Sequence, residues 1–157
     1  MLREKKPPDN LFYFLDVFSE RYKISTTEEN ARKKRILLVD DELDITLAIK
    51  TVLEESGIFQ VEAFYDPVLA LLRFKTGAYD LAILDIRMPE MNGFQLFRKL
   101  REIDSNLKIC FLTAAELNHY RETDSDIIDE LEKDYFVVKP VETTDLINRL
   151  KVMLSQN

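Results

Sequence analysis

Two adjacent carboxylates end an apolar run in the stretch ILLVDDELD, residues 36–44. The run at 36–39 is too short for a helix and shows no alternation, which predicts a strand buried on both faces of a parallel sheet. Open α/β sheets bind their ligands just beyond the carboxyl ends of such strands. Either Asp40 or Asp41 could cap the next helix. One cap still leaves the other aspartate in need of a chemical role.

Three further polar residues end later apolar runs: Asp85 in DLAILD, Thr113 in LKICFLT and Lys139 in YFVVK. The carboxyl ends of parallel strands meet at one edge of a sheet, so we expect these side chains close to Asp40 and Asp41. Two like charges about 4 Å apart cost on the order of 4 kcal/mol at an effective dielectric constant of about 20. The carboxylates therefore need a shared proton or a cation among them.

The donor set indicates which cation would suit this cluster. Oxygen ligands without histidine or cysteine favour a hard divalent ion, and Mg²⁺ with several retained waters is the natural choice. The Lys139 ammonium would add a positive charge, and the Thr113 hydroxyl a hydrogen-bond donor. A metal, an ammonium and a hydroxyl around one aspartate are suited to hold a transferred phosphoryl group.

The elements that must position these residues alternate from residue 36 onward. We predict strands at 36–39, 59–65, 80–85, 107–113 and 135–139. We predict helices at 44–57, about 67–76, 94–104 and 143–155, with the polar segment 115–133 partly helical. Five strands that are each followed by a helix predict an α/β fold with a doubly wound parallel sheet and helices on both faces.

The composition is that of an ordinary globular chain. Of 157 residues, 46% are hydrophobic and 32% are charged, and the formal net charge is −7, which argues against a nucleic-acid partner. The single cysteine, Cys110, lies in an apolar run and is predicted to be a buried structural thiol. No apolar stretch approaches the length needed to span a membrane, and no signal-peptide cleavage site is present, so a cytoplasmic location without membrane binding is expected.

The quoted motifs resemble the receiver domain of two-component response regulators. The matching pieces are ILLVDDE, DLAILDIRMPEMNGFQL around Asp85, FLTA with Thr113, and FVVKP with Lys139-Pro140. They occur in the family's order and with near-family spacing over roughly residues 35–155. The resemblance implies a flavodoxin-like (βα)5 sheet with strand order 2-1-3-4-5 for residues 35–157.

The resemblance also assigns a role to each residue of the acidic cluster. It implies that Asp85 is the phosphoacceptor, which takes a phosphoryl group from a sensor histidine kinase or a phosphotransfer protein. Asp41 is then a direct Mg²⁺ ligand, with Asp40 assisting partly through water. The backbone carbonyl of Arg87 would complete the metal ligands that the protein supplies. The alternative interpretation is that Asp85 only caps a helix and has no chemical role.

Lys139 and Thr113 are implied to bind phosphoryl oxygens, with a cis Lys139-Pro140 bond that orients the lysine. Asn92-Gly93 is expected to form a tight turn after the acceptor. Phe136 occupies the switch position where many receivers carry tyrosine. Phenylalanine lacks the hydroxyl, so we expect the switch to work by packing alone.

The resemblance implies a signalling switch and not an enzyme, beyond self-catalysed phosphoryl acceptance and slow autodephosphorylation. The alternative is a pseudo-receiver, a binding module with the same fold that ignores phosphate. Because the sequence ends after the fifth predicted helix, output is expected through contacts with a downstream protein or by onward phosphoryl transfer. The segment 114–135 holds eight acidic residues, and it is either a solvated face or a docking surface for a basic partner.

Residues 1–34 have no counterpart in the receiver pattern. Five apolar residues fall on one helical stripe and predict an aromatic-rich helix at about 11–22: Leu11, Phe14, Leu15, Phe18 and Tyr22. A polar linker is predicted at 23–34. The stripe requires burial against the receiver itself, another protein, or a second copy in a homodimer.

Overall fold

The computed structural model describes residues 32–114, 124–131 and 135–156. The chain divides into two units, Met1–Arg32 and Lys33–Asn157, and the second contains nearly all the described residues. The predicted helix at 11–22 and most of the acidic segment lie outside the described residues, so both stay predictions. Within the part that is described, no helix is both long enough and apolar enough to cross a membrane.

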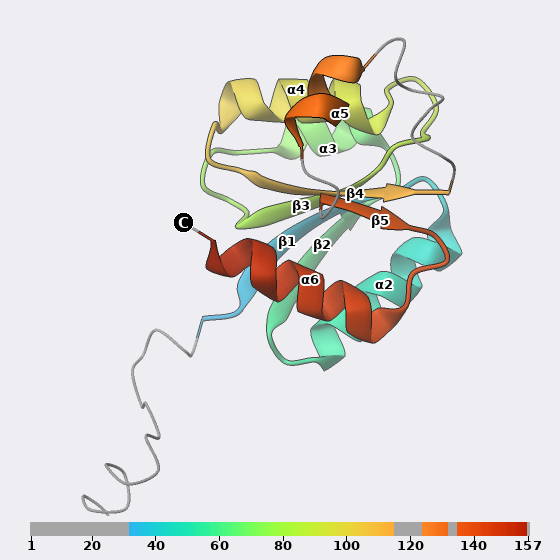
Figure 1. The fold of residues 1–157 in the computed structure, drawn as a ribbon, viewed down its shortest axis with the longest axis vertical. Helices are drawn as coiled ribbons and strands as arrows, with labels where there is room; N and C mark the ends of the chain where they lie inside the picture. The colour runs from blue at the N-terminus through green and yellow to red at the C-terminus, as the bar shows by residue number, and fades with distance from the viewer. Residues whose placement is uncertain (1–31, 115–123, 132–134, 157) are drawn as a thin grey trace, which may run out of the picture. The chain divides into compact units, whose positions relative to one another are not determined.

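The second unit is built on a five-stranded parallel sheet with the order β2-β1-β3-β4-β5 (Figure 1). The strands are β1 Lys34–Val39, β2 Phe59–Phe64, β3 Leu81–Asp85, β4 Lys108–Thr113 and β5 Phe136–Val138. This confirms the predicted doubly wound fold and its strand order. β3 is buried along its whole length and β1 and β4 along most of theirs, as expected for strands covered on both faces.

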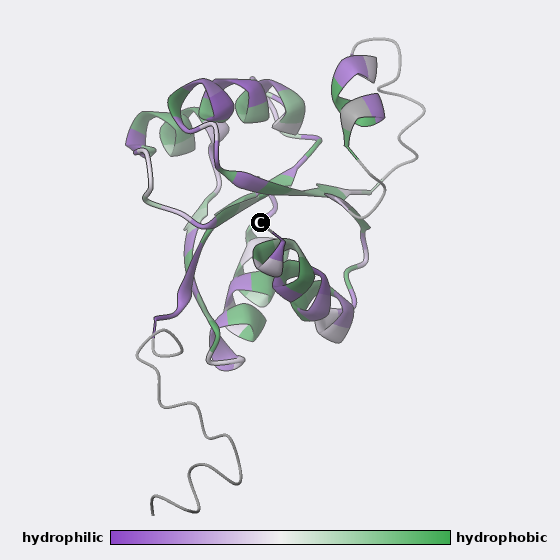
Figure 2. Ribbon diagram, turned by 60° about the vertical axis from the view of Figure 1, so that its left-hand side comes forward, coloured by the Kyte–Doolittle hydropathy of each residue, from purple (hydrophilic) through white to green (hydrophobic). Residues whose placement is uncertain are grey.

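Among the described residues, five helices cover the two faces of the sheet. They are α2 Leu43–Glu55, α3 Pro67–Arg73, α4 Gly93–Ile103, α5 Ser125–Glu130 and α6 Thr143–Ser155. α2 and α6 lie on one face and α3, α4 and α5 on the other (Figure 1), so the core consists of two apolar clusters separated by the sheet. Hydrophobic and hydrophilic residues alternate along the helices (Figure 2), as amphipathic packing requires. The Cys110 thiol is buried between strands and helices, as predicted.

Helix α3 ends earlier than the predicted position near residue 76. It begins normally, since the Asp66 side chain caps its first turn and Pro67 follows in the first helical position. Phe74 then adopts an extended conformation, with φ −66° and ψ 139°. Its buried ring stacks on Tyr79 with 5.7 Å between ring centroids. The packing of one aromatic side chain therefore ends the helix.

The short helix α5 is held in place by side chains from outside it. Arg98 of α4 donates hydrogen bonds to Asp124 at 2.8 Å and to Asp126 at 2.9 Å. The Asp124 side chain is only 4% exposed, and Ile127 and Ile128 enter the core. Two of the acidic residues in the 114–135 segment are thus paired within the chain, which lessens the negative charge that they offer to a basic partner.

Candidate functional site

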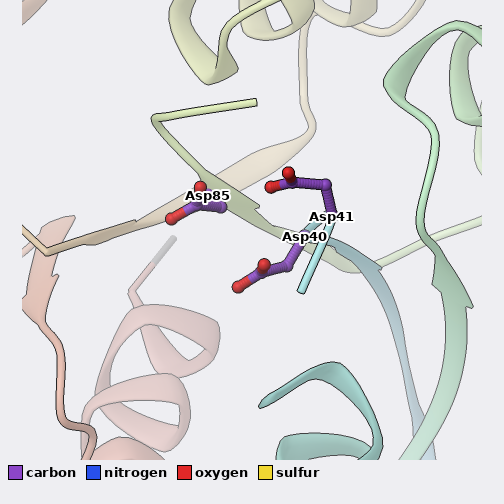
Figure 3. Close-up of side chains that lie close together, drawn as sticks. All are labelled: Asp40, Asp41 and Asp85. Atoms are coloured by element: carbon purple, nitrogen blue, oxygen red, sulfur yellow. The ribbon is translucent and has the colours of Figure 1, made fainter. Parts of the chain in front are cut away.

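Three carboxylates meet at the carboxyl edge of the sheet, as predicted from the sequence. Asp40 and Asp41 follow β1, Asp85 is the last residue of β3, and these two strands are neighbours at the centre of the sheet. One oxygen from each carboxylate lies within 4.8 Å of the others (Figure 3). Asp40 and Asp85 are buried, with 0% and 3% exposure, whereas Asp41 is exposed.

The local structure after β1 shows that Asp40 does not cap helix α2. The residue at the N-cap position is Glu42, and its side chain makes no capping hydrogen bond. Asp40 instead accepts a hydrogen bond from the Glu42 backbone N–H through Oδ1 at 2.9 Å. The buried Thr46 hydroxyl donates to the Asp40 carbonyl at 3.0 Å. These bonds fix the backbone of the acidic doublet and leave Asp40 Oδ2 pointing into the site.

Lys139 lies among the carboxylates and contacts more of them than the sequence suggested. Its ammonium Nζ lies 2.7 Å from Asp40 Oδ2, 3.1 Å from Asp85 Oδ1 and 3.0 Å from Glu42 Oε1, and the side chain is 8% exposed. The backbone N–H of Lys139 donates to the Thr113 carbonyl at 2.7 Å. The peptide bond to Pro140 is cis, as predicted. The contact with Glu42 was missed, although this acidic residue directly follows the doublet.

The electrostatics of the site follow from burial and from these contacts. The pKa of Asp85 is raised to about 6. Burial is the main cause, the nearby charges of Asp40 and Asp41 add to it, and the contact with Lys139 partly offsets it. Burial opposes the charged form of Lys139, yet the close carboxylates of Asp40, Glu42 and Asp85 hold the pKa of the ammonium well above its usual value. Near neutral pH the site therefore holds several carboxylates against one ammonium, an excess of negative charge that favours a cation.

The donor set fits Mg²⁺. All three carboxylates offer oxygen, and Asp40 Oδ2 is a buried oxygen that makes no hydrogen bond of good geometry, although the Lys139 ammonium is close to it. Ligands of one Mg²⁺ ion, each about 2.1 Å from the metal, lie at most about 4.2 Å apart. The three carboxylate oxygens lie within 4.8 Å of one another, so the cluster is compact enough for one such ion, with a carboxylate able to bind either directly or through a retained water.

Arg87 lies two residues beyond Asp85 and is exposed. Together with three neighbours it lines a pocket of about 360 Å³ that opens beside the end of β3; the neighbours are Ile86, Met88 and Asn92. The role of its backbone carbonyl as a metal ligand stays a prediction.

The connection from β3 to α4 differs from the predicted tight turn at Asn92-Gly93. Asn92 is the N-cap of α4, where its side chain accepts from the Gln95 N–H at 2.8 Å and its own N–H donates to the Gln95 side chain at 3.0 Å. The residue with positive φ in this loop is Glu90, at 66°. Gly93 is needed for space, since a Cβ atom there would lie 2.4 Å from the Asp85 carbonyl oxygen. Asn92 caps this helix, so Asp85 is not a helix cap.

The two residues that are predicted to act in the switch, Thr113 and Phe136, lie next to the site and in the core. Thr113 is the last residue of β4 and is 2% exposed. It directly follows Leu112, which pairs with Asp85 in the sheet. Phe136 is buried, and its ring stacks on Phe111 with 5.4 Å between centroids and an interplanar angle of 18°. Phe94 packs edge-on against it at 6.4 Å. In the described conformation the Phe136 ring is therefore packed inside the apolar cluster.

The fold and the carboxyl edge together define a CheY-like receiver. Residues 36–151 match the response regulator receiver domain family, and the chain belongs to this family of two-component signalling proteins. It is 36% identical over 124 residues to the response regulator receiver protein CpdR of Brucella abortus. The aligned region covers 77% of this chain and 97% of CpdR. It resembles a CheY-like receiver domain protein from Methanospirillum hungatei with a TM-score of 0.66 and 26% identity, over 78% of this chain and 94% of that one.

Other relatives are longer. The transcriptional regulatory protein DltR of Streptococcus agalactiae is 32% identical over 123 residues, which are 78% of this chain and 53% of DltR. This chain therefore spans about half the length of that relative. The shared half is the receiver, and the match confirms the predicted family without extending to the rest of DltR.

Proposed function

We propose that this protein is a phosphorylatable receiver in which Asp85 accepts a phosphoryl group from a phosphohistidine of a sensor kinase or phosphotransfer protein. The observation that carries the proposal is the contact of the buried Asp85 carboxylate with Lys139 Nζ at 3.1 Å, beside two further carboxylates. A helix cap or a solvated aspartate has no need of a buried ammonium. Apart from accepting and slowly losing this group, the protein is proposed to have no enzymatic turnover.

The proposed transfer is a displacement at phosphorus. An oxygen of the Asp85 carboxylate forms a bond to phosphorus while the bond from phosphorus to the donor imidazole nitrogen breaks, and the nitrogen keeps the electron pair. With a pKa of about 6, Asp85 is ionised at neutral pH, as a nucleophile must be. Lys139 holds one carboxylate oxygen and later binds the phosphoryl group.

Asp40, Asp41, Asp85 and the Arg87 carbonyl are the residues that would hold Mg²⁺. The ion would supply positive charge that offsets the phosphoryl oxygens. The chain's own residues orient the acceptor and keep it from bulk water, since Asp85 is 3% exposed.

The switch is proposed to work by packing. The Thr113 hydroxyl would donate a hydrogen bond to a phosphoryl oxygen as its loop closes, and Phe136 would adjust within the aromatic cluster of Phe94 and Phe111. Phe136 has no hydroxyl, so it cannot report through a hydrogen bond. The new surface would then be read by a downstream protein.

The proposal is tested by the intact mass of the protein after incubation with acetyl phosphate, with and without Mg²⁺. We expect a gain of one phosphoryl group that requires Mg²⁺ and is absent in Asp85→Asn. The same measurement separates the receiver from the pseudo-receiver. Folded wild-type protein that gains no mass from acetyl phosphate, and none from a phosphorylated histidine phosphotransfer domain either, would support the pseudo-receiver.

A protein donor must also bind to the rim of the site, because Asp85 itself is almost inaccessible. Leu43 and Leu47 lie one turn apart at the start of α2, which follows the acidic doublet after Glu42, and they are 52% and 46% exposed. Exposed apolar side chains beside a buried reactive group favour contact with a partner protein. We propose that this turn of α2 contacts the phosphodonor protein.

Leu47→Asp is expected to slow phosphoryl transfer from a phosphorylated histidine phosphotransfer domain by about tenfold, the effect of losing one important interface residue. Phosphorylation by acetyl phosphate should be unchanged, because that donor needs no protein contact. The matched control is Val152→Asp on α6, which is 57% exposed. Equal slowing in both variants, or an equal effect with acetyl phosphate, would argue against this surface.

A further inference from the structure

Three carboxylates surround the ammonium of Lys139 in the described conformation, and they match its three N–H donors in number. A lysine ammonium carries three N–H donors. Three carboxylates lie within hydrogen-bond distance of Nζ: Asp40 at 2.7 Å, Glu42 at 3.0 Å and Asp85 at 3.1 Å. A phosphoryl oxygen can therefore bind Lys139 only if one of these carboxylates gives up its place.

The three carboxylates differ in how readily they could leave. The side chains of Asp40 and Asp85 are 0% and 4% exposed, so either would lose its pairing without gaining water. The Glu42 side chain is 58% exposed, and water can replace its contact with Lys139. Asp85 is also the proposed phosphoacceptor and must remain beside the ammonium. Glu42 is therefore the partner that leaves at the lowest cost.

The backbone places Glu42 for this contact. Its N–H donates to Asp40 Oδ1 at 2.9 Å, and its carbonyl accepts from the Thr46 N–H at 3.0 Å and the Thr46 hydroxyl at 2.9 Å. Glu42 is the N-cap residue of α2, yet its side chain makes no capping bond and reaches Lys139, 97 positions away in the sequence. These bonds hold the Glu42 backbone at a position from which its side chain reaches Lys139.

We propose that Glu42 is a positioning residue that holds the Lys139 ammonium in the unphosphorylated protein and competes with the phosphoryl group for it. This inference rests on the proposed function. Glu42 keeps the lysine oriented over Asp85 at rest, and it yields one N–H donor when a phosphoryl oxygen arrives. The competition lowers the affinity of the site for a phosphoryl group.

The test is the affinity for beryllofluoride, a stable mimic of a phosphoryl group, measured by calorimetry at saturating Mg²⁺. Glu42→Gln keeps the length and a neutral acceptor but removes the charge that pairs with Lys139. We expect beryllofluoride to bind about two- to fivefold more tightly, because exposed ion pairs contribute at most a factor of this size. The affinity for Mg²⁺ alone is expected to stay within about twofold.

Asp44→Asn is the matched control, because it removes one negative charge from the exposed first turn of the same helix. Asp44 is not among the carboxylates that contact Lys139. Its variant should bind beryllofluoride as the wild type does. In a Lys139→Met background, Glu42→Gln should no longer tighten binding, since the contact is already lost.

A second readout needs no metal or mimic. Burial and the three close carboxylates slow the exchange of the Lys139 ammonium protons with water. The ¹⁵N spectra of the metal-free protein should therefore show this ammonium in wild type and Asp44→Asn, and show it broadened in Glu42→Gln. Equal tightening by Glu42→Gln and Asp44→Asn, or weaker binding in Glu42→Gln, overturns the inference and leaves the proposed function intact. Wild-type protein that binds no beryllofluoride with Mg²⁺ contradicts the proposed function itself.

Discussion

Without divalent metal, the Asp85→Asn variant is expected to be more stable than the wild type at pH 7.5 by about 3 kcal/mol. Burial raises the pKa of Asp85 from 3.8 to about 6, and each pKa unit corresponds to about 1.4 kcal/mol. Ionised Asp85 therefore costs folding free energy near neutral pH, and asparagine removes this cost while keeping the shape. Urea unfolding in the presence of EDTA measures the difference.

The same shift fixes the direction of the pH dependence. The folded state binds the Asp85 proton at a higher pH than the unfolded chain does, so this residue makes the wild type more stable as the pH falls from about 7 through 6 toward 4. Asp85→Asn lacks that contribution, so the difference in unfolding free energy between the variant and the wild type should become smaller as the pH falls. Mg²⁺ should also make this difference in stability smaller, because its binding stabilises the wild type more than the variant. A variant that is less stable than wild type at pH 7.5 without metal would contradict this account.

The fold was predictable because its strands are short apolar runs that the sheet buries on both faces. Such runs can be recognised from their own sequence, without knowing which elements pack against them. β3 is the clearest case, since every residue in it is buried. The end of α3 was predicted too late because it depends on the tertiary packing of Phe74 against Tyr79. Helix α5 has only six residues, too few for a periodic pattern, and its position depends on Arg98 from another helix.

For the site, the sequence predicts which strand ends come together, but not every side-chain contact there. Parallel strands bring Asp40 and Asp85 together whatever the loops do, and the structure has Lys139 between them. The contact of Glu42 with Lys139 could not be predicted, because it depends on the reach and direction of a side chain that also had the option of pointing into water. The same holds for Gly93, whose spatial requirement comes from the course of the loop.

Gly93→Ala is expected to destabilise the protein by about 2–3 kcal/mol, as overpacking in a tightly packed region does. The new Cβ would lie 2.4 Å from the Asp85 carbonyl oxygen, 3.0 Å from Ile86 Cα and 3.1 Å from the Asp85 carbonyl carbon. All three are backbone atoms, so no side chain can rotate away and the chain between β3 and α4 must shift. The shift moves the backbone of the phosphoacceptor itself.

We therefore expect Gly93→Ala to slow phosphorylation by acetyl phosphate at least about tenfold, since misplacing a reacting group by about 1 Å can cost more than this. Urea unfolding and intact mass measure the two effects. Gly77→Ala is the matched control, because nothing lies within 4 Å of its Cβ position while its φ of +68° strains any other residue. It should lose about 1–2 kcal/mol of stability and keep the wild-type phosphorylation rate. If Gly93→Ala folds as stably as the wild type, the close approach of α4 to Asp85 does not constrain the acceptor loop.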